Sequence, residues 1–146
     1  MVIRRHYFII FILSLLPLFS GCAGMIAAHK ADTLFYSNNY AEAAKLYSEG
    51  AFKKATINKA VYLLNLATAQ FWNGNYNDAL ANFTAAEIAS YNKNAIVSTM
   101  VASDRLPYQL KDFEVSYLHF FKAACYYFQN ETEKSMIELR KSLRAE

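Results

Sequence analysis

The sequence predicts an all-α protein built from antiparallel helix pairs, and three observations support that fold class. Apolar side chains recur at spacings of three, four and seven residues, which is the spacing of one helical face, through most of the chain after residue 24. The chain holds only four glycines and two prolines, the residues that interrupt helices most strongly. No stretch alternates polar and apolar residues as a half-buried strand does. We therefore expect helices that pack through apolar faces.

The chain begins with a segment that we set apart from the fold. Arg4 and Arg5 precede an apolar run over residues 7–19, which is too short for a comfortable membrane span. The run leads into Leu-Phe-Ser-Gly-Cys at residues 18–22, which resembles a bacterial lipobox. The resemblance implies that residues 1–21 are a lipoprotein signal peptide and that Cys22 becomes the acylated first residue. An ordinary secretory signal that ends near a cysteine is the alternative.

The remaining residues, 22–146, suffice for one small domain. Without Arg4 and Arg5, the balance of fifteen basic and twelve acidic side chains becomes thirteen and twelve. No basic patch remains that would favour nucleic acid as a partner. With Cys22 committed to lipid, Cys125 has no partner for an intramolecular disulfide, and we expect a buried thiol, with a redox or intermolecular role as the alternative.

The pattern of a helix pair is clearest over residues 74–86. The Gly-Asn pair at 74–75 favours the backbone angles that end one helix and begin another. Small side chains on the helical face that follows would let a neighbouring helix approach closely, and large ones would fill the space around them. The large residues are Tyr76, Leu80 and Phe83, and the small ones are Ala79 and Ala86.

Two other stretches repeat this arrangement. Residues 38–50 reproduce it with Tyr40 in the place of Tyr76, and residues 130–142 reproduce it more weakly. Tyr40 and Tyr76 are 36 residues apart, close to the tetratricopeptide period of about 34, whereas Thr132 follows Tyr76 by 56. The longer interval fits one period plus an insertion. We therefore predict helix pairs at about 25–54, 57–90 and 108–145, with the insertion at about 91–107.

This spacing resembles that of tetratricopeptide repeats, and the resemblance implies a short solenoid of stacked helix pairs. The chain departs from the family pattern at Ala31, Ala67 and Ala123, where glycine is usual. In proteins of this architecture the first helix of each pair lines a groove, which here would be aromatic and weakly polar and would take a peptide or a partner helix. The predicted binding residues are Asp32, Phe35, Asn65, Thr68, Phe71, Phe120 and Tyr127. The alternative, that these side chains pack against neighbouring helices, stays open.

The last third of the chain shows a second resemblance. Its motifs are Pro-Tyr at 107–108, Phe-Glu at 113–114, Lys-Ala at 122–123 and Glu-Leu-Arg at 138–140. In this order and spacing they resemble those of an uncharacterised group of bacterial envelope lipoproteins. The resemblance implies a surface lipoprotein with repeat helices and no established chemistry.

The helix predicted over residues 109–129 carries two apolar stripes. One passes through Phe113 and Phe120, and the other through Leu118 and Phe121. A helix that is apolar on two sides is typically enclosed by other helices. We therefore expect neighbours on both faces.

The helix predicted over residues 131–144 is more polar. Met136, Leu139 and Leu143 are expected to point inward. Charged side chains, Glu138 among them, are expected to point outward, so that this helix would form a polar cap of the solenoid.

The sequence contains no motif for catalysis or for binding a cofactor. His29 and His119 are far apart, and neither has a cysteine or carboxylate at the spacing of metal ligands. A glycine-rich phosphate loop and a Gly-x-Ser-x-Gly nucleophile motif are both missing. We therefore expect neither catalytic residues nor a metal site, and a protein that is not an enzyme.

Together these features predict a non-catalytic lipoprotein that binds or scaffolds another component of the cell envelope. Its partners would be an envelope protein or peptide, and the membrane that holds its lipid, but not nucleic acid. Residue 23 is Ala rather than the Asp that retains many lipoproteins at the inner membrane, so we expect the periplasmic face of the outer membrane in a Gram-negative cell. Two alternatives are a pilotin-like accessory of secretin or pilus assembly and a carrier of an apolar ligand such as lipid.

Overall fold

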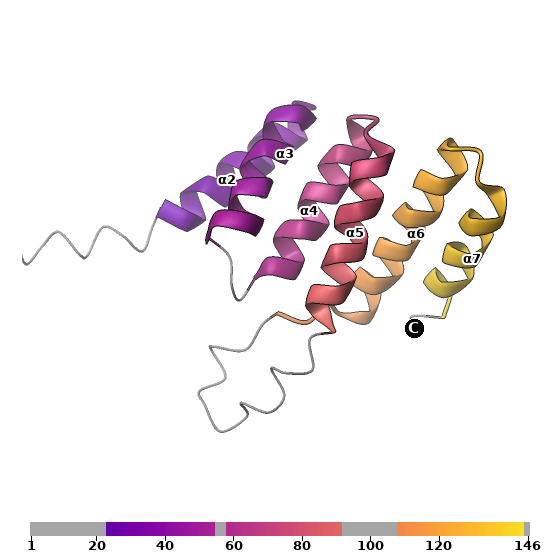
Figure 1. Cartoon of the computed structure of the whole chain (residues 1–146). Helices are drawn as coiled ribbons and strands as arrows, with labels where there is room; N and C mark the ends of the chain where they lie inside the picture. The colour runs from indigo at the N-terminus through magenta and orange to yellow at the C-terminus, as the bar shows by residue number, and fades with distance from the viewer. Residues whose placement is uncertain (1–22, 55–57, 92–107, 145–146) are drawn as a thin grey trace, which may run out of the picture.

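The computed structural model describes residues 23–54, 58–91 and 108–144 (Figure 1). The predicted signal peptide, the predicted lipidation site Cys22 and all of the predicted insertion except Tyr91 lie outside these ranges. The statements that follow concern the described residues.

Within the described ranges, every regular element is a helix, which confirms the all-α fold class. The α-helices are α2 (Ala23–Tyr36), α3 (Tyr40–Glu49), α4 (Lys59–Trp72), α5 (Tyr76–Ser90), α6 (Asp112–Phe128) and α7 (Thr132–Ser142). A short π-helix, η2 (Gly50–Lys54), continues α3. Neighbouring helices pack in pairs, α2 with α3, α4 with α5 and α6 with α7, and the pairs stand in a row (Figure 1). The fold is therefore repeat-like, as the spacing of the three stretches predicts.

The turns inside the three pairs share one geometry. Each contains one residue with a left-handed backbone: Asn38 and Asn130 at φ 62° and Gly74 at φ 79°. In every case the next residue donates its N–H to a carbonyl five residues earlier, as Asn75 does to Gln70 at 2.9 Å. Glycine and asparagine tolerate this conformation best, which explains why they stand at the three turns.

The core lies mainly between α4, α5 and α6. Ala79, Phe83 and Ala86 of α5 are fully buried, as the interleaving of small and large residues predicts. A second, smaller cluster joins α2 and α3 to α4. Gly50 shows why a small residue is required at the close approach of two helices, since a Cβ there would lie 2.5 Å from the ring of Tyr62.

The prediction that α6 is enclosed on both sides is wrong for one of its stripes. Leu118 and Phe121 are buried against the core, as expected. Phe113 and Phe120, on the other stripe, are 67% and 51% exposed. Phe113 and Tyr117 of this stripe instead line an open pocket together with residues of α2 and α4.

The predicted orientation of α7 is also wrong. Met136, Leu139 and Leu143 are exposed, whereas Glu138 and Ser142 are buried. The reason is that the facing side of α6 is polar, so that polar groups of α7 must turn inward to satisfy it. Neither hydrophobic core cluster contains a buried residue of α7.

Candidate functional site

The first helices of the three pairs, α2, α4 and α6, share one open pocket of about 490 Å³. This volume is within the usual range for ligand pockets. Tyr47 from α3 completes the wall. We call this pocket the groove; its lining residues are Asp32, Phe35, Tyr36, Tyr47, Leu64, Asn65, Thr68, Phe113, Glu114 and Tyr117.

Four of the predicted binding residues line the groove. Asp32 and Phe35 come from α2, and Asn65 and Thr68 come from α4. The two residues of α2 are 30 or more positions from the two residues of α4 in the sequence, and the stacking of helix pairs brings them together. Their shared place follows from the equivalence of the first helix in each pair.

Phe71 is placed differently from its prediction. Its ring packs against other aromatic rings, with centroids 4.8 Å from Phe121, 5.6 Å from Tyr76 and 6.0 Å from Phe128. Phe71 lies against the main core cluster and does not line the groove. The alternative of packing against neighbouring helices therefore describes this residue.

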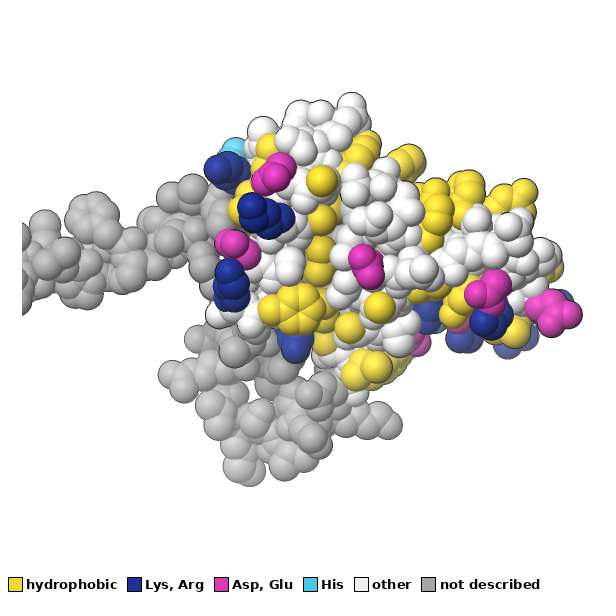
Figure 2. All heavy atoms as spheres, turned by 45° about the horizontal axis from the view of Figure 1, so that its top comes forward, with side chains coloured by type: hydrophobic (Ala, Val, Ile, Leu, Met, Phe, Trp, Pro, Cys, Tyr) yellow, Lys and Arg dark blue, Asp and Glu magenta, His cyan; other side chains and the backbone are white. Residues whose placement is uncertain are grey.

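Phe120 and Tyr127 are exposed but are not part of the groove lining. Their rings contact Phe121 and Phe128, with centroids 5.5 and 5.8 Å apart. Figure 2 shows hydrophobic side chains gathered over the α6–α7 end of the molecule. These two residues extend the aromatic surface of α6 beyond the groove.

The groove also contains residues that the sequence reasoning did not select: Tyr36, Tyr47, Leu64, Phe113, Glu114 and Tyr117. A signal for two of them was present, because Phe113 and Tyr117 are four residues apart on one helical face. From the sequence alone, such a stripe predicts a face that packs against another helix. Without the structure, nothing showed that this face of α6 is open.

Two hydrogen bonds, one part-buried and one buried, engage polar side chains in the walls of the groove. The hydroxyl of Tyr47 donates to Oδ1 of Asp32 at 2.5 Å and joins α3 to α2. Burial, together with this bond to the carboxylate, raises the pKa of Tyr47 well above its ordinary value, so its hydroxyl stays protonated. In α4, the hydroxyl of Thr68 donates to the carbonyl of Leu64 at 2.8 Å.

Glu114 organises the start of α6 on the opposite wall. Its Oε2 accepts the hydroxyl of Tyr108 at 2.8 Å and the backbone N–H of Lys111 at 2.9 Å. The second bond caps the helix N-terminus, where a negative charge is favourable. The hydrogen bond to Glu114 raises the pKa of Tyr108. Glu114, part of the motif seen in the sequence, thus has a structural role as well as a place in the groove.

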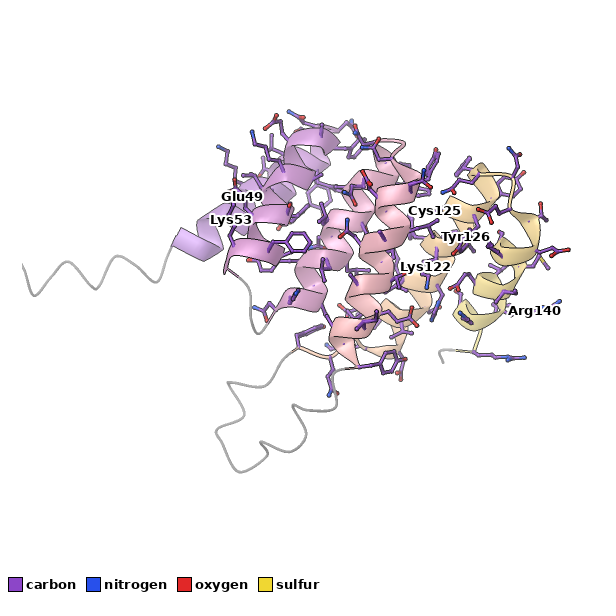
Figure 3. All side chains as sticks on the ribbon, in the orientation of Figure 1. Glu49, Lys53, Lys122, Cys125, Tyr126 and Arg140 are labelled. Atoms are coloured by element: carbon purple, nitrogen blue, oxygen red, sulfur yellow. The ribbon has the colours of Figure 1, made fainter. Side chains whose placement is uncertain are left out.

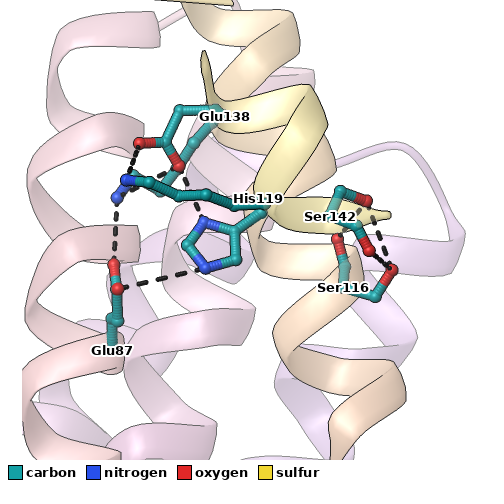
Figure 4. Close-up of polar contacts among 7 residues, drawn as sticks. Glu87, Ser116, His119, Glu138 and Ser142 are labelled. Carbon is teal, nitrogen blue, oxygen red and sulfur yellow. Dashed lines mark hydrogen bonds and ion pairs between the residues drawn. The ribbon is translucent and has the colours of Figure 1, made fainter. Parts of the chain in front are cut away.

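Outside the groove, a cluster of polar side chains lies between α5, α6 and α7 (Figure 4). Nδ1 of His119 is 2.7 Å from Oε2 of Glu138, and Nζ of Lys122 is 3.0 Å from Oε2 of Glu87 and 3.5 Å from Oε2 of Glu138. Nζ of Lys141 is 2.7 Å from Oε1 of Glu138. His119, Lys122 and Glu138 are each at least nine-tenths buried, so this cluster joins α5, α6 and α7 through buried ion pairs.

Glu138 is the centre of this cluster. Burial by itself would raise the pKa of its carboxyl group. Hydrogen bonds with Lys141 and His119, and the charge of Lys122, outweigh burial and hold that pKa below its ordinary value. Glu138 is therefore a buried carboxylate with satisfied partners.

Cys125 is the described thiol of the chain, and it is buried. Burial raises its pKa to about 12, so the thiolate is scarce at neutral pH. Figure 3 shows Cys125 and Lys122 on the side of α6 that faces α5, whereas Glu49 and Lys53 project from the first pair. Cys125 thus acts as a small apolar core residue.

Metal sites and membrane-spanning helices are two further features to consider in the described ranges. No group of three or more His, Cys, Asp or Glu side chains in those ranges is arranged to hold a metal ion. None of the helices in those ranges has the length and apolarity needed to cross a bilayer.

No protein-family model matches this chain, and no curated protein matches its sequence. The function proposed below therefore rests on the residues and the geometry described above.

Proposed function

We propose that this protein is a lipid-anchored, non-catalytic scaffold that binds a segment of another envelope protein in the groove. The observation that carries the proposal is the open face of α6 and α2 around the groove. Tyr36, Phe113 and Tyr117 are 83%, 67% and 42% exposed there and line one pocket. Exposed aromatic side chains that converge on a pocket are typical of protein-binding surfaces, because they supply large contact area at a low entropy cost.

The chemistry of the groove favours a protein segment over an apolar small molecule. A carrier of lipid would need a closed apolar cavity, whereas this groove is open and contains the carboxylates of Asp32 and Glu114 and the amide of Asn65. Such a mixture of aromatic and polar groups suits a peptide, which has both apolar side chains and hydrogen-bonding groups.

The membrane anchor and the location are parts of the same proposal. They depend on the lipobox resemblance at residues 18–22 and on Ala23 after the cysteine. Acylation of Cys22 would hold the groove close to the membrane surface, where envelope partners are concentrated. Metabolic labelling with a palmitate analogue tests this part: the native chain should be labelled, and a Cys22→Ser chain should not.

The binding role is tested with a pair of groove variants. Phe113→Ala and Tyr117→Ala together remove two rings of α6 that are 67% and 42% exposed, so helix content should be kept, and the melting temperature should fall only modestly because the Tyr117 ring also packs against Phe121. After cross-linking in membranes, the native chain should co-purify with a stoichiometric envelope protein, and the double variant should lose most of it.

Ile88→Ala is the matched control. Ile88 on α5 is 68% exposed and does not line the groove, so its replacement removes an exposed apolar side chain elsewhere. Equal recovery of the partner by the groove variant and by the control would contradict binding in the groove.

A further inference from the structure

We propose that the groove takes an arginine side chain of the bound segment, between the carboxylates of Asp32 and Glu114 and against the aromatic rings beside them. This inference rests on the function proposed above and specifies the chemistry of the partner. It follows from the charges of the lining, the aromatic walls and the acceptor atoms that the fold leaves available.

The charge of the groove is one-sided. Asp32 on α2 and Glu114 on α6 both line it, and none of the lining residues is Lys, Arg or His. Among the described residues, neither carboxylate lies within ion-pair distance of a basic side chain, although Glu87 and Glu138 each do. The mature chain is close to neutral, so this concentration of negative charge is local. A cationic group would complement it.

Each carboxylate has one oxygen engaged and one oxygen left to accept. Oδ1 of Asp32 accepts the hydroxyl of Tyr47, and Oε2 of Glu114 accepts from Tyr108 and Lys111. No described donor bonds to the second oxygen of either side chain. Because the first oxygen is held in place, the second is positioned before a ligand arrives, which lowers the entropic cost of binding.

The aromatic walls select a guanidinium among cations. Phe35 and Tyr36 on one side and Phe113 and Tyr117 on the other line the same pocket as the carboxylates. A guanidinium is planar and weakly hydrated, so it stacks on aromatic faces while its five N–H groups reach carboxylates. Arginine therefore uses both features of the groove.

The test uses two short peptides and the full chain in detergent. One peptide is acetyl-Ala-Arg-Ala-amide, and the other has citrulline, the neutral isostere, in place of arginine. When the arginine peptide is titrated into the chain, the NMR signals of the backbone amides of Asp32, Asn65 and Glu114 should change their chemical shifts. The citrulline peptide should bind at least about tenfold more weakly, because charge-assisted hydrogen bonds are lost.

Two variants test which groups hold the cation. Asp32→Asn and Glu114→Gln keep an oxygen that can accept from Tyr47 or from Tyr108 and Lys111, so the walls should remain in place. Each should weaken binding of the arginine peptide about tenfold while leaving the citrulline peptide unchanged. Glu133→Gln, an exposed acid on α7 outside the groove, is the matched control and should have no effect.

The outcomes separate this inference from the proposed function. The arginine site is overturned if both peptides bind equally or if neither binds. It is also overturned if the Asp32 and Glu114 variants bind the arginine peptide as the native chain does. If the envelope partner is still lost from the Phe113 and Tyr117 double variant in that case, the groove binds protein by other contacts. If the double variant also keeps its partner, the proposed function fails as well.

Discussion

The second and third helix pairs have the same backbone plan and opposite interface chemistry. In the α4–α5 pair the facing residues are mainly apolar, and Leu63, Ala79 and Ala86 are almost completely buried. At the same positions of the α6–α7 pair, 56 residues later, stand His119, Ser135 and Ser142. The hydroxyl of Ser142 donates to the carbonyl of Ser116 at 2.9 Å, and that of Ser135 donates to the carbonyl of Ala123 at 2.9 Å.

The difference shows that one helix-pair geometry can be held by two kinds of force. Apolar burial holds α5, whereas hydrogen bonds and buried ion pairs hold α7. Buried ion pairs contribute little net stability, but removal of one partner is costly because the other charge remains. We therefore expect α7 to open more readily than α5. We also expect the stability of α7 to depend on pH in a way that the stability of α5 does not.

The largest expected effect of a single change is in the apolar pair. Phe83→Ala removes a fully buried ring from the main core cluster and should lower the free energy of unfolding by about 3–5 kcal/mol. Urea denaturation followed by circular dichroism measures this loss. Phe113→Ala, which removes an exposed ring, should cost less than about 0.5 kcal/mol, and a similar loss in both variants would contradict the assignment of the core.

The corresponding change in the polar pair is Glu138→Ala. It leaves His119 buried without its acceptor and leaves Lys122 with Glu87 as its remaining partner, which should cost about 3 kcal/mol and act mainly on α7. Hydrogen exchange should become about 100-fold faster at α7 amides and change much less at α5 amides. Glu133→Ala is the control on the same helix, since Glu133 is exposed. Uniform acceleration over all helices would argue against a separate polar unit.

Much of the fold, but less of the groove, could be predicted from the sequence. The burial of Ala79 and Ala86 and the turn at Gly74 could be predicted, because each depends on the residues of its own helix or turn. The orientation of α7 was not predictable from hydrophobicity, because it depends on His119 and Lys122 of another helix. Only part of the groove lining could be predicted, for the same reason. Whether the aromatic face of α6 is open depends on how the other helices pack around it.

Acid should weaken the polar pair before the apolar one. Because the pKa of Glu138 is held below its ordinary value, its contribution to stability is complete above that ordinary value. The contribution is lost as the pH falls through the lowered pKa of the folded state. Hydrogen exchange at about pH 3 and pH 6, corrected for intrinsic rates, should show lower protection of α7 at the acidic pH. In Glu138→Gln this pH dependence should be smaller, and an unchanged dependence would remove Glu138 as its source.

The smallest expected effect comes from one hydroxyl group. Ser142→Ala removes the bond to the carbonyl of Ser116 and makes the position resemble Ala86 of the apolar pair. The loss of stability should be about 1 kcal/mol, measured by denaturation or by exchange at α7. An increase in stability would mean that the polar character of this interface does not support α7.

The comparison also locates the surface that is available to a partner. Core contacts occupy one side of α6, the ion pairs and serines fix α7, and the aromatic side of α6 that lines the groove remains open. Site-specific photo-cross-linking tests this central claim most directly. Benzoylphenylalanine is placed at Tyr117, in the groove, or at Ile88, outside it, in cells that produce the chain with Cys22 intact. We expect one discrete cross-linked envelope protein from position 117 and none from position 88. The same product from both positions, or only from position 88, would contradict this claim.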